Sequence, residues 1–359
     1  MTSSLSSVEA TELAQSVRAA CERLATPERV RNIAYEGGGF DRELWSVLCE
    51  QIGVVSMGLP EDAGGAGYGV SALGVVGLEL GRALAPVPFV ATAVLAMGVL
   101  ADLGDRDRAA ALADGSRTAT VVIDSQNSDL TATARDGGWR MDGTARHVLH
   151  GADADDLIVI VDTGDGLSAF AVERAAAGVD SAPQRVLDPT RPMATITMTG
   201  ATAQPLGPAA RAVSRNTMRA MAVLSAEQVG AHEAVLDIAA EYARTREQFG
   251  RPIGSFQAVK HRAADMLVAL EWSRSASLAA LEAIDTDSDD AGWLTSLAKA
   301  VCSEGLREAS HANLQIHGGI GFTWEDSAHL YLRRARTDEV LFGAPGEHWD
   351  RVGTDAKIY

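Results

Sequence analysis

The sequence is poor in aromatic residues and in positive charge. Aromatic residues make up 5% of its 359 residues, so a core must be built mostly from Ala, Leu, Val and Ile, which favours closely packed helices. Lys and Arg number 31 against 48 Asp and Glu, giving a formal net charge of −17. Nucleic acids require a clustered cationic face, and the longest basic run is Arg333-Arg334-Ala335-Arg336. We therefore expect no nucleic-acid partner.

Cysteines and long apolar runs are also scarce. Cys21, Cys49 and Cys302 are far apart and lack the spacing of metal ligands, so we predict reduced core thiols and no metal site. Every apolar run meets a charge well before the roughly 18 residues of a membrane span, so no membrane association is predicted. The segment Met1–Leu24 lacks a basic stretch ahead of an apolar one, which argues against a signal peptide. Together these features predict a cytoplasmic protein.

The composition is that of an ordinary globular protein, 47% apolar and 22% charged, in a chain long enough for two or three domains. Hydrophobic periodicity divides the chain into three zones. The apolar spacing is helical up to about Leu112, has period two from about Thr118, and is helical again from Pro208. We therefore predict a mainly α fold with a β middle domain: an N-terminal helical domain (1–116), a small β barrel or sandwich (117–206) and a C-terminal four-helix bundle (207–359).

Capping residues, turn residues and Gly or Pro breaks predict where the individual helices and strands begin and end. Asp41 is an expected helix N-cap, and a Gly-rich loop at 59–69 separates two helices. The β zone is expected to be antiparallel, with a buried strand at 157–161 and a turn within 139–143. Its Asp-Gly pairs, at 136–137, 142–143 and 165–166, are typical of hairpins. Further helices are predicted at about 71–84, 91–103, 209–246, 256–285, 292–317 and 325–338, the last four forming the bundle.

Arginines crowd the end of the first bundle helix, in Tyr242-Ala-Arg-Thr-Arg-Glu-Gln-Phe-Gly-Arg-Pro-Ile-Gly-Ser-Phe-Gln257. Arg244, Arg246 and Arg251 can compensate the helix dipole at this end. They can also form an anion clamp, because the guanidinium fork matches a pyrophosphate. The residues alone leave both interpretations open.

Glycines cluster in Gln315-Ile-His-Gly-Gly-Ile-Gly-Phe322. One interpretation is a helix that ends at His317 with Gly318 as its cap. The other is a glycine-lined surface that a ligand approaches closely, with the Gln315 amide as donor and acceptor. The cluster does not follow a strand, as a dinucleotide-binding fingerprint would.

As a pair, these two segments resemble the C-terminal bundle of acyl-CoA dehydrogenases. Leu59-Pro-Glu-Asp-Ala-Gly-Gly-Ala-Gly67 is similar to a loop between N-terminal helices of that family, and Trp139-Arg-Met-Asp-Gly-Thr-Ala-Arg146 to its middle β domain. The resemblance covers nearly the whole chain. It implies a FAD enzyme that removes two hydrogens from an acyl-CoA, in which a carboxylate takes the α proton and the β hydride passes to the flavin.

The resemblance also implies which residues hold the cofactor. These residues would contact the FAD seated on a neighbouring subunit: Arg246 at the pyrophosphate, Gln248 and Phe249 along the adenosine half, Phe256 packed nearby, and Gln315, Gly318 and Gly319 at the dinucleotide.

The chain departs from the family pattern at the catalytic base. Family members usually place a Glu in a Tyr-Glu-Gly step after the last bundle helix, where this chain has Phe342. A minority place it early in the first bundle helix, where this chain has Ala220. Neither side chain can abstract a proton. Glu227, Glu339 and Glu347 are fallback candidates, and we expect them to be solvated surface groups.

A second departure is in the β domain. The family's Thr-Glu-Pro…Gly-Ser-Asp loop, which contacts the flavin ring, is shortened here to Val121–Asp129 and lacks its Pro and Gly. The chain thus keeps the residues that would hold FAD but lacks those of the reaction centre. This combination resembles the non-catalytic (β) subunit of heterotetrameric (α2β2) acyl-CoA dehydrogenases.

That subgroup implies a catalytic partner subunit supplying the Glu, a bulky acyl-CoA as substrate in lipid or steroid catabolism, and an electron-transferring flavoprotein as acceptor. Two alternatives stay open. One is a homo-oligomeric acyl-CoA dehydrogenase with an unusual base, and the other is a non-enzymatic scaffold that binds an acyl-CoA or a dehydrogenase.

Overall fold

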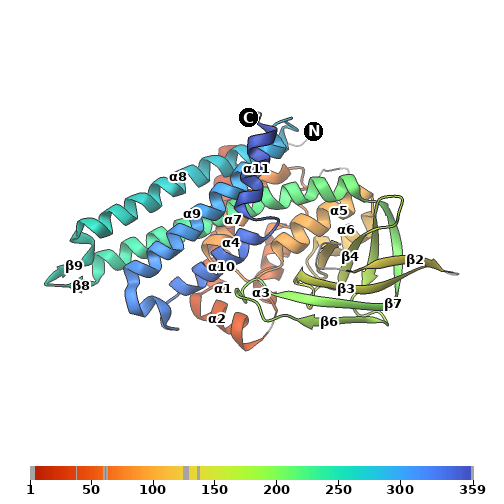
Figure 1. Ribbon diagram of the computed structural model, residues 1–359, viewed down its shortest axis with the longest axis horizontal. Helices are drawn as coiled ribbons and strands as arrows, with labels where there is room; N and C mark the ends of the chain where they lie inside the picture. Colours follow the sequence, from red (N-terminus) through yellow and green to blue (C-terminus); the bar gives the residue numbers. More distant parts are fainter. Residues whose placement is uncertain are drawn as a thin grey trace. The chain divides into compact units, whose positions relative to one another are not determined.

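The protein is represented by a computed structural model that describes residues 5–37, 39–59, 61, 64–123, 129–135 and 138–356. The chain divides into two compact units, each assembled from stretches that are separated in sequence. The first unit combines Glu28–Gly69 with Pro86–Ala220, and the second combines Ser4–Pro27, Val70–Ala85 and Met221–Tyr359. Figure 1 draws both units.

Short helices accompany the sheet of the first unit. They are α2 (Pro27–Glu36), α3 (Arg42–Ser46), the π-helical η1 (Val47–Ile52) and η3 (Phe89–Ala96), α5 (Met97–Leu103) and α6 (Arg106–Ala113). The predicted cap at Asp41 is confirmed, because its carboxylate accepts from the Leu44 N–H at 3.0 Å. The hydroxyl of Thr92 in η3 donates to the Ala119 carbonyl at 2.8 Å, which ties this helix to the first strand.

The strands are β1 (Ala119–Ile123), β2 (Thr131–Arg135), β3 (Gly138–Leu149), β4 (Asp156–Asp162), β5 (Leu167–Glu173), β6 (Val179–Pro183) and β7 (Met193–Pro208). Their order is β1-β4-β5-β7-β3-β2, with β6 also paired to β7. The predicted strand at 157–161 is confirmed, and its residues are buried throughout. Leu157, Val159 and Val161 join a core that includes Met141, Phe170 and Ile196.

Two predictions for the sheet are wrong. Residues 139–143 form no turn but lie within β3, where a bulge after Met141 accommodates the Asp-Gly pair in the pairing with β7. Met141 is fully buried, so its packing outweighs the local turn preference. The sheet is also not purely antiparallel, since β1 pairs with β4 in parallel. Asp165-Gly166 does lie in the connection between antiparallel β4 and β5, whereas Asp136-Gly137 lies outside the described residues.

The second unit is a helical bundle. It contains α1 (Ser7–Leu24), α4 (Gly69–Arg82), most of α7 (Ala210–Thr245), α8 (Gln257–Asp285), α9 (Ala291–His317), α10 (Ala328–Val340) and α11 (Pro345–Asp355). The four predicted bundle helices are confirmed to within a few residues, while α11 was not predicted. Helices α4 and α7 approach closely: a Cβ added at Gly81 would collide with the Glu227 carbonyl, and one added at Gly230 with the Leu78 carbonyl.

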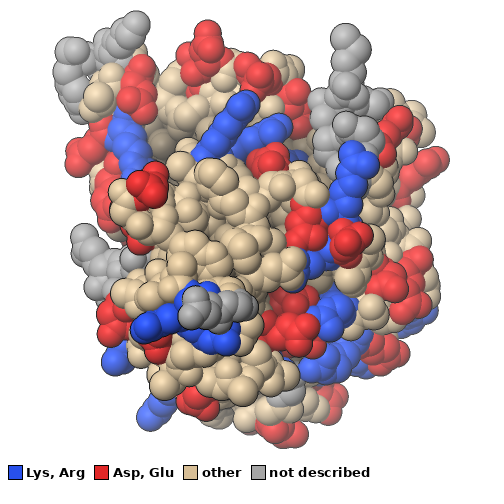
Figure 2. Space-filling view, turned by 90° about the vertical axis from the view of Figure 1, so that its right-hand side faces the viewer, with Lys and Arg blue, Asp and Glu red and all other residues tan. Residues whose placement is uncertain are grey.

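The predicted fold class, mainly α with a β middle region, is therefore confirmed. The division into domains at 116/117 and 206/207 stays a prediction, although helix changes to strand near the first boundary and strand to helix near the second. The cysteines are buried free thiols, as predicted. None of the described helices has the length and hydrophobicity of a membrane span. On the face shown in Figure 2, the Lys and Arg side chains lie among Asp and Glu rather than in one continuous basic patch.

Candidate functional site

The arginine-rich segment after α7 forms a small hairpin. Strand β8 (Glu247–Gln248) pairs antiparallel with β9 (Arg251–Pro252), and the hairpin lies at the end of α7 and α8 in Figure 1. The two turn residues, Phe249 and Gly250, have φ of 56° and 76°, the left-handed values that two-residue hairpin turns require. Phe249 is 91% exposed at the tip. A phenylalanine rarely adopts this backbone region, so the hairpin holds an apolar side chain out at a cost in conformational energy.

The three arginines of this segment have different environments. Arg244 forms an ion pair with Glu241 at 2.5 Å. The Arg251 guanidinium lies over the Phe256 ring, 4.2 Å from its centroid. Arg246 is exposed, and within the described residues its side chain has neither an ion pair nor a hydrogen bond. Arg244, in the last turn of α7, is therefore already neutralised by Glu241, while Arg246 is the arginine available to an external anion.

The backbone of the glycine segment after α9 is exposed at Gly318 and Gly319, because no side chains cover it there. Gln315 is exposed in the last turn of α9, and Gly318 follows the helix with φ 62° and ψ −139°, a conformation that only glycine adopts readily. A Cβ added at Gly318 or Gly319 would meet no atom within 4 Å. Gly318 thus caps α9, as predicted. Because this cap is also exposed, the helix-cap interpretation and the ligand-surface interpretation of the segment are compatible.

A ring stack brings the two segments together. Tyr242 in α7 stacks on His317 at the end of α9, with ring centroids 4.1 Å apart. His317 is buried, and its Nδ1 lies 2.9 Å from the Asn313 carbonyl oxygen and its Nε2 3.7 Å from the Asp326 carboxylate. The sequence did not predict this joining role for either ring. The only sequence signal was that one ring lies in each of the two motifs.

The chemistry of this surface fits an anionic dinucleotide such as FAD. Arg246 offers an uncompensated guanidinium, Gln248 and Gln315 offer exposed amides, and the two exposed glycines leave the backbone open to close approach. Phe256 meets Phe249 edge to face, with centroids 6.1 Å apart, and adds an aromatic surface. The hairpin lies on the outside of this unit, so this surface is open to a ligand from solvent.

The two positions at which the family resemblance implies a base lack a carboxylate here. Phe342 lies half-buried in the turn after α10, with φ 63°. Lys299 Nζ donates to the carbonyls of Glu339 and Gly343, at 3.1 and 3.3 Å, and His348 Nε2 lies 3.1 Å from the Phe342 carbonyl oxygen. Burial lowers the pKa of Lys299 to about 8. This turn is therefore held rigidly by neighbouring side chains.

Ala220, at the other position, is fully buried within α7. Its methyl group has no proton-accepting atom, so nothing at this position can act as a general base.

The expectation that the fallback carboxylates are solvated is wrong for two of them. Glu227 is buried and forms an ion pair with Arg334, which is buried as well. Glu339 is buried and forms ion pairs with Arg307 and, at 2.6 Å, with Arg336. Burying a carboxylate requires such partners, so these oxygens are committed to guanidinium groups. Only Glu347 is exposed as expected.

The expectation for the shortened Val121–Asp129 loop is not tested, because residues 124–128 lie outside the described residues. In the described part of the chain, no three His, Cys, Asp or Glu side chains are grouped as metal ligands would be.

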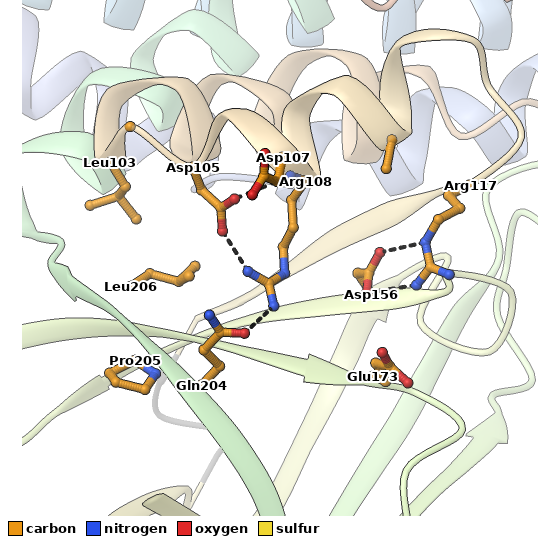
Figure 3. A pocket seen from close by; sticks show the side chains of 12 residues that line it. Leu103, Asp105, Asp107, Arg108, Arg117, Asp156, Glu173, Gln204, Pro205 and Leu206 are labelled. Atoms are coloured by element: carbon orange, nitrogen blue, oxygen red, sulfur yellow. Dashed lines mark hydrogen bonds and ion pairs between the residues drawn. The ribbon is translucent and has the colours of Figure 1, made fainter. Parts of the chain in front are cut away.

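The first unit has a polar pocket between α6 and strands β4, β5 and β7 (Figure 3). This pocket is less suited to an anion than the surface around Arg246. Arg108 bonds to Asp105 and Gln204, both at 2.6 Å. Arg117 forms a bidentate pair with Asp156, at 2.9 and 3.0 Å. Both guanidinium groups are neutralised, and Glu173 adds a further negative charge to the lining. We assign the pocket no ligand.

Comparison with known proteins identifies the family. The model of the acyl-CoA dehydrogenase C-terminal domain matches residues 210–355, and that of the acyl-CoA dehydrogenase N-terminal domain matches residues 7–112. The chain is 34% identical over 346 residues to acyl-CoA dehydrogenase IpdE2 of Mycobacterium tuberculosis, covering 96% of each protein.

Solved structures agree with this relationship. The ChsE4-ChsE5 complex from Mycobacterium tuberculosis matches with a TM-score of 0.90 and 29% identity, over 99% of both chains. A Tcur3481-Tcur3483 steroid ACAD variant matches with a TM-score of 0.88 and 31% identity, over 98% of both chains. With both domain models matched, the chain belongs to the acyl-CoA dehydrogenase family, whose members are FAD-dependent flavoproteins.

Proposed function

We propose that this chain is the non-catalytic subunit of a hetero-oligomeric acyl-CoA dehydrogenase that carries out α,β-dehydrogenation of an acyl-CoA thioester. The observation that carries this proposal is a contrast between two parts of the chain. Phe342 and Ala220 occupy the base positions implied by the family resemblance, whereas Arg246 and its neighbours are exposed and available to a dinucleotide. A base must lie within hydrogen-bonding distance of its proton, so a partner subunit has to supply the catalytic Glu.

When bound, FAD would supply the hydride acceptor for this reaction. The role of this chain would be to hold the far end of the cofactor seated on the partner subunit. Arg246 would neutralise the pyrophosphate, and the exposed Phe249 would lie along the adenosine half. Further contacts would come from Gln248 and Phe256 in and beside the hairpin and from Gln315, Gly318 and Gly319 after α9.

The relatives support a heteromeric assembly and a large substrate. ChsE4-ChsE5 is a complex of two differently named chains, and the Tcur3481-Tcur3483 protein is a steroid ACAD. For this chain we propose an α2β2 heterotetramer acting on a bulky acyl-CoA, such as one with a steroid side chain. It would act in lipid or steroid catabolism in the cytoplasm and pass electrons to an electron-transferring flavoprotein.

The two alternative functions have less support. A homo-oligomeric enzyme would need an unusual base, but Glu227 and Glu339 are both buried in ion pairs with arginine. A scaffold without redox chemistry would have no use for an unpaired Arg246 beside exposed amides and glycines.

The test is the flavin-to-protein ratio of the chain purified alone and co-expressed with a base-bearing dehydrogenase subunit. We expect little flavin on the chain alone and about one FAD per heterodimer in the complex. Arg246→Ala should reduce flavin retention by the complex by about ten-fold, because a charge-assisted pair is lost. Arg244→Ala is the matched control: this arginine lies at the same helix end but is already paired with Glu241. A yellow homo-oligomer with one FAD per chain would refute the proposal.

A further inference from the structure

A further cavity of the first unit lies where the loop between α2 and α3 passes the turn that follows β3. Its volume is about 650 Å³, within the range of small-molecule sites. Its walls come from three stretches that are distant in sequence, namely described residues of 33–42, 150–153 and 181–193. All three belong to the first unit, and none of them contributes to the FAD contacts proposed above.

Hydrogen bonds between the second and third of these stretches fix one side of the cavity. The Ser181 hydroxyl donates to the Gly151 carbonyl at 2.9 Å. The His150 N–H donates to the Pro192 carbonyl, also at 2.9 Å. A ligand would therefore meet a wall that is already formed, which lowers the entropic cost of binding.

The cavity is lined mainly by apolar side chains. Ile33 of α2, Val186 and Met193 are among them, and the third stretch adds three prolines. Because the proline ring fixes φ, the backbone of this wall has little freedom. Such a surface suits the apolar body of a small ligand better than a sugar or a polyphosphate.

Two of the described lining residues, Arg42 and Asp153, carry opposite charges. Arg42 is exposed, and its guanidinium lies over the Phe40 ring, 4.7 Å from the centroid. Asp153 is half-buried, and burial raises the pKa of its carboxyl, while the nearby charges of Arg42 and Arg174 act against this shift. Within the described residues, neither the Arg42 nor the Asp153 side chain has an ion pair or a hydrogen bond. A cation and an anion therefore line one cavity without pairing with each other.

The cavity also contains acceptors that lack a donor. Gly39 lies directly against the Asp153 carboxylate, so that an added Cβ would overlap it. The Gln184 Nε2 group donates to the Thr195 hydroxyl at 2.9 Å, while the buried Oε1 atom has no hydrogen-bond partner within the described residues. An unpaired buried acceptor costs free energy. A ligand group that carries several N–H donors would be stabilised here.

We infer that this cavity binds a small zwitterion of the amino-acid type with an apolar side chain. The ammonium group would donate to the Asp153 carboxylate and to Gln184 Oε1, and the carboxylate would accept from Arg42. The apolar side chain would lie against the wall that includes Ile33 and Met193. This inference does not depend on the FAD contacts or on the missing base.

Simpler ligands match only part of the cavity. A plain anion would be repelled by Asp153, and a plain cation would be repelled by Arg42. A neutral apolar molecule would remove water from both charges and supply no partner for either. The pair of unpaired opposite charges therefore favours a molecule that carries both.

The experiment measures the binding of L-phenylalanine to the full chain by isothermal titration calorimetry, in a buffer free of other zwitterions. Three partial ligands test the parts of the site. Phenethylamine lacks the carboxylate, 3-phenylpropanoate lacks the ammonium group, and glycine lacks the apolar side chain. Arg42→Gln and Asp153→Asn each remove one charge at nearly constant size. Arg185→Gln and Asp180→Asn are matched controls, because these residues are exposed near the same wall but do not line the cavity.

We expect one L-phenylalanine to bind per chain with a Kd of about 1 mM or below. Each partial ligand should bind at least about ten-fold more weakly, because it leaves part of the site unmatched. Asp153→Asn should weaken L-phenylalanine binding about ten-fold, and Arg42→Gln, at a more exposed position, about three-fold. Arg42→Gln should not weaken the binding of phenethylamine, which has no carboxylate. The Arg185 and Asp180 variants should match the parent within about two-fold.

The inference is overturned if L-phenylalanine does not bind at about 10 mM, or if any partial ligand binds as tightly. It is also overturned if Arg42→Gln binds L-phenylalanine like the parent, or if a control change is as damaging as the change it is matched to. Far-ultraviolet circular dichroism checks that each variant is folded, and the exposed position of Arg42 keeps the test valid should Asp153→Asn not fold. A failure here would leave the proposed FAD contacts unaffected.

Discussion

Tyr242 stacks on His317 with the ring centroids 4.1 Å apart and the ring planes inclined by 21°. Tyr242 lies about one turn before Arg246 and the hairpin, and His317 immediately precedes the glycines that follow α9. His317 is buried and bonded to the Asn313 carbonyl, so it provides a fixed platform. The stack therefore joins two motifs that are distant in sequence and that we propose hold FAD together.

Tyr242→Ala should separate these two motifs without unfolding the bundle. Loss of the ring from a half-buried stack should lower the free energy of unfolding by about 1–3 kcal/mol. Flavin retention by the complex should fall as well, because Arg246 and Gly318 would no longer be held in fixed positions. Urea denaturation and the flavin-to-protein ratio measure the two effects.

The matched control is Tyr242→Phe, which keeps the stacked ring and removes only the hydroxyl. It should retain both stability and flavin. Equal flavin retention by the Ala and Phe variants would mean that the stack contributes stability alone and does not organise the ligand surface.

The sequence predicted the long helices well because their apolar spacing extends over many turns. Helices α7, α8 and α9 begin and end within a few residues of their expected limits. Helix α11 was missed because Gly346 and Gly353 weaken its pattern, although Pro345 at its first turn is a recognised start signal. Strand β7 extends to Pro208 although its last residues include Gly and Pro, which weaken a strand pattern in the sequence.

The candidate site was predictable only where it depends on local sequence. The exposed arginine, the turn at Phe249-Gly250 and the cap at Gly318 follow from neighbouring residues. The buried pair of Glu227 and Arg334 does not, because its members are 107 positions apart and Arg334 lies in a basic run that looks like a surface feature. Such pairings depend on how helices pack, and a single sequence does not reveal the packing.

Arg334→Met should be among the most destabilising single changes in the helical unit. It leaves the Glu227 carboxylate buried without its cation, for which a loss of about 3–5 kcal/mol in the free energy of unfolding is expected. Glu227→Gln should also destabilise the protein, but the double variant should lose less than the sum of the two. A double-mutant cycle from urea denaturation at fixed protein concentration measures this coupling. Strictly additive losses would show that the two side chains do not stabilise each other.

Gly81→Ala should be destabilising although Ala is the better helix former. The new methyl group would collide with the Glu227 carbonyl where α4 passes α7, and relieving this overlap should cost about 1–3 kcal/mol. Gly292→Ala is the matched control, since this glycine is in the first turn of α9 and an added Cβ meets no atom within 4 Å. It should be neutral or stabilise by up to about 1 kcal/mol. Thermal denaturation distinguishes the two, and equal melting temperatures would contradict the close helix crossing.

His348 should make the protein sensitive to mild acid. Burial, together with the nearby charges of Lys299 and Arg351, lowers the pKa of His348 to about 4. The unfolded chain keeps an ordinary histidine pKa of about 6.5. Between these values the unfolded state binds more protons than the folded state, so stability is lost as the pH falls from about 6.5 towards 4, by at most about 1.4 kcal/mol per pH unit. His232, whose pKa is also lowered to about 4 by burial, should add to the effect.

His348→Gln isolates the contribution of His348 to this acid sensitivity. The amide can still donate to the Phe342 carbonyl, which the histidine ring contacts at 3.1 Å, but it does not titrate. The variant should therefore keep the turn after α10. Its stability should fall less steeply between pH 6.5 and pH 5, because His232 still titrates there but position 348 no longer does. Urea denaturation of both proteins at several pH values measures the difference between their free energies of unfolding. Both proteins carry the same carboxylates, so the contribution of these groups cancels in the difference. Parallel stability curves would mean that the buried ring at position 348 does not titrate differently in the folded and unfolded states.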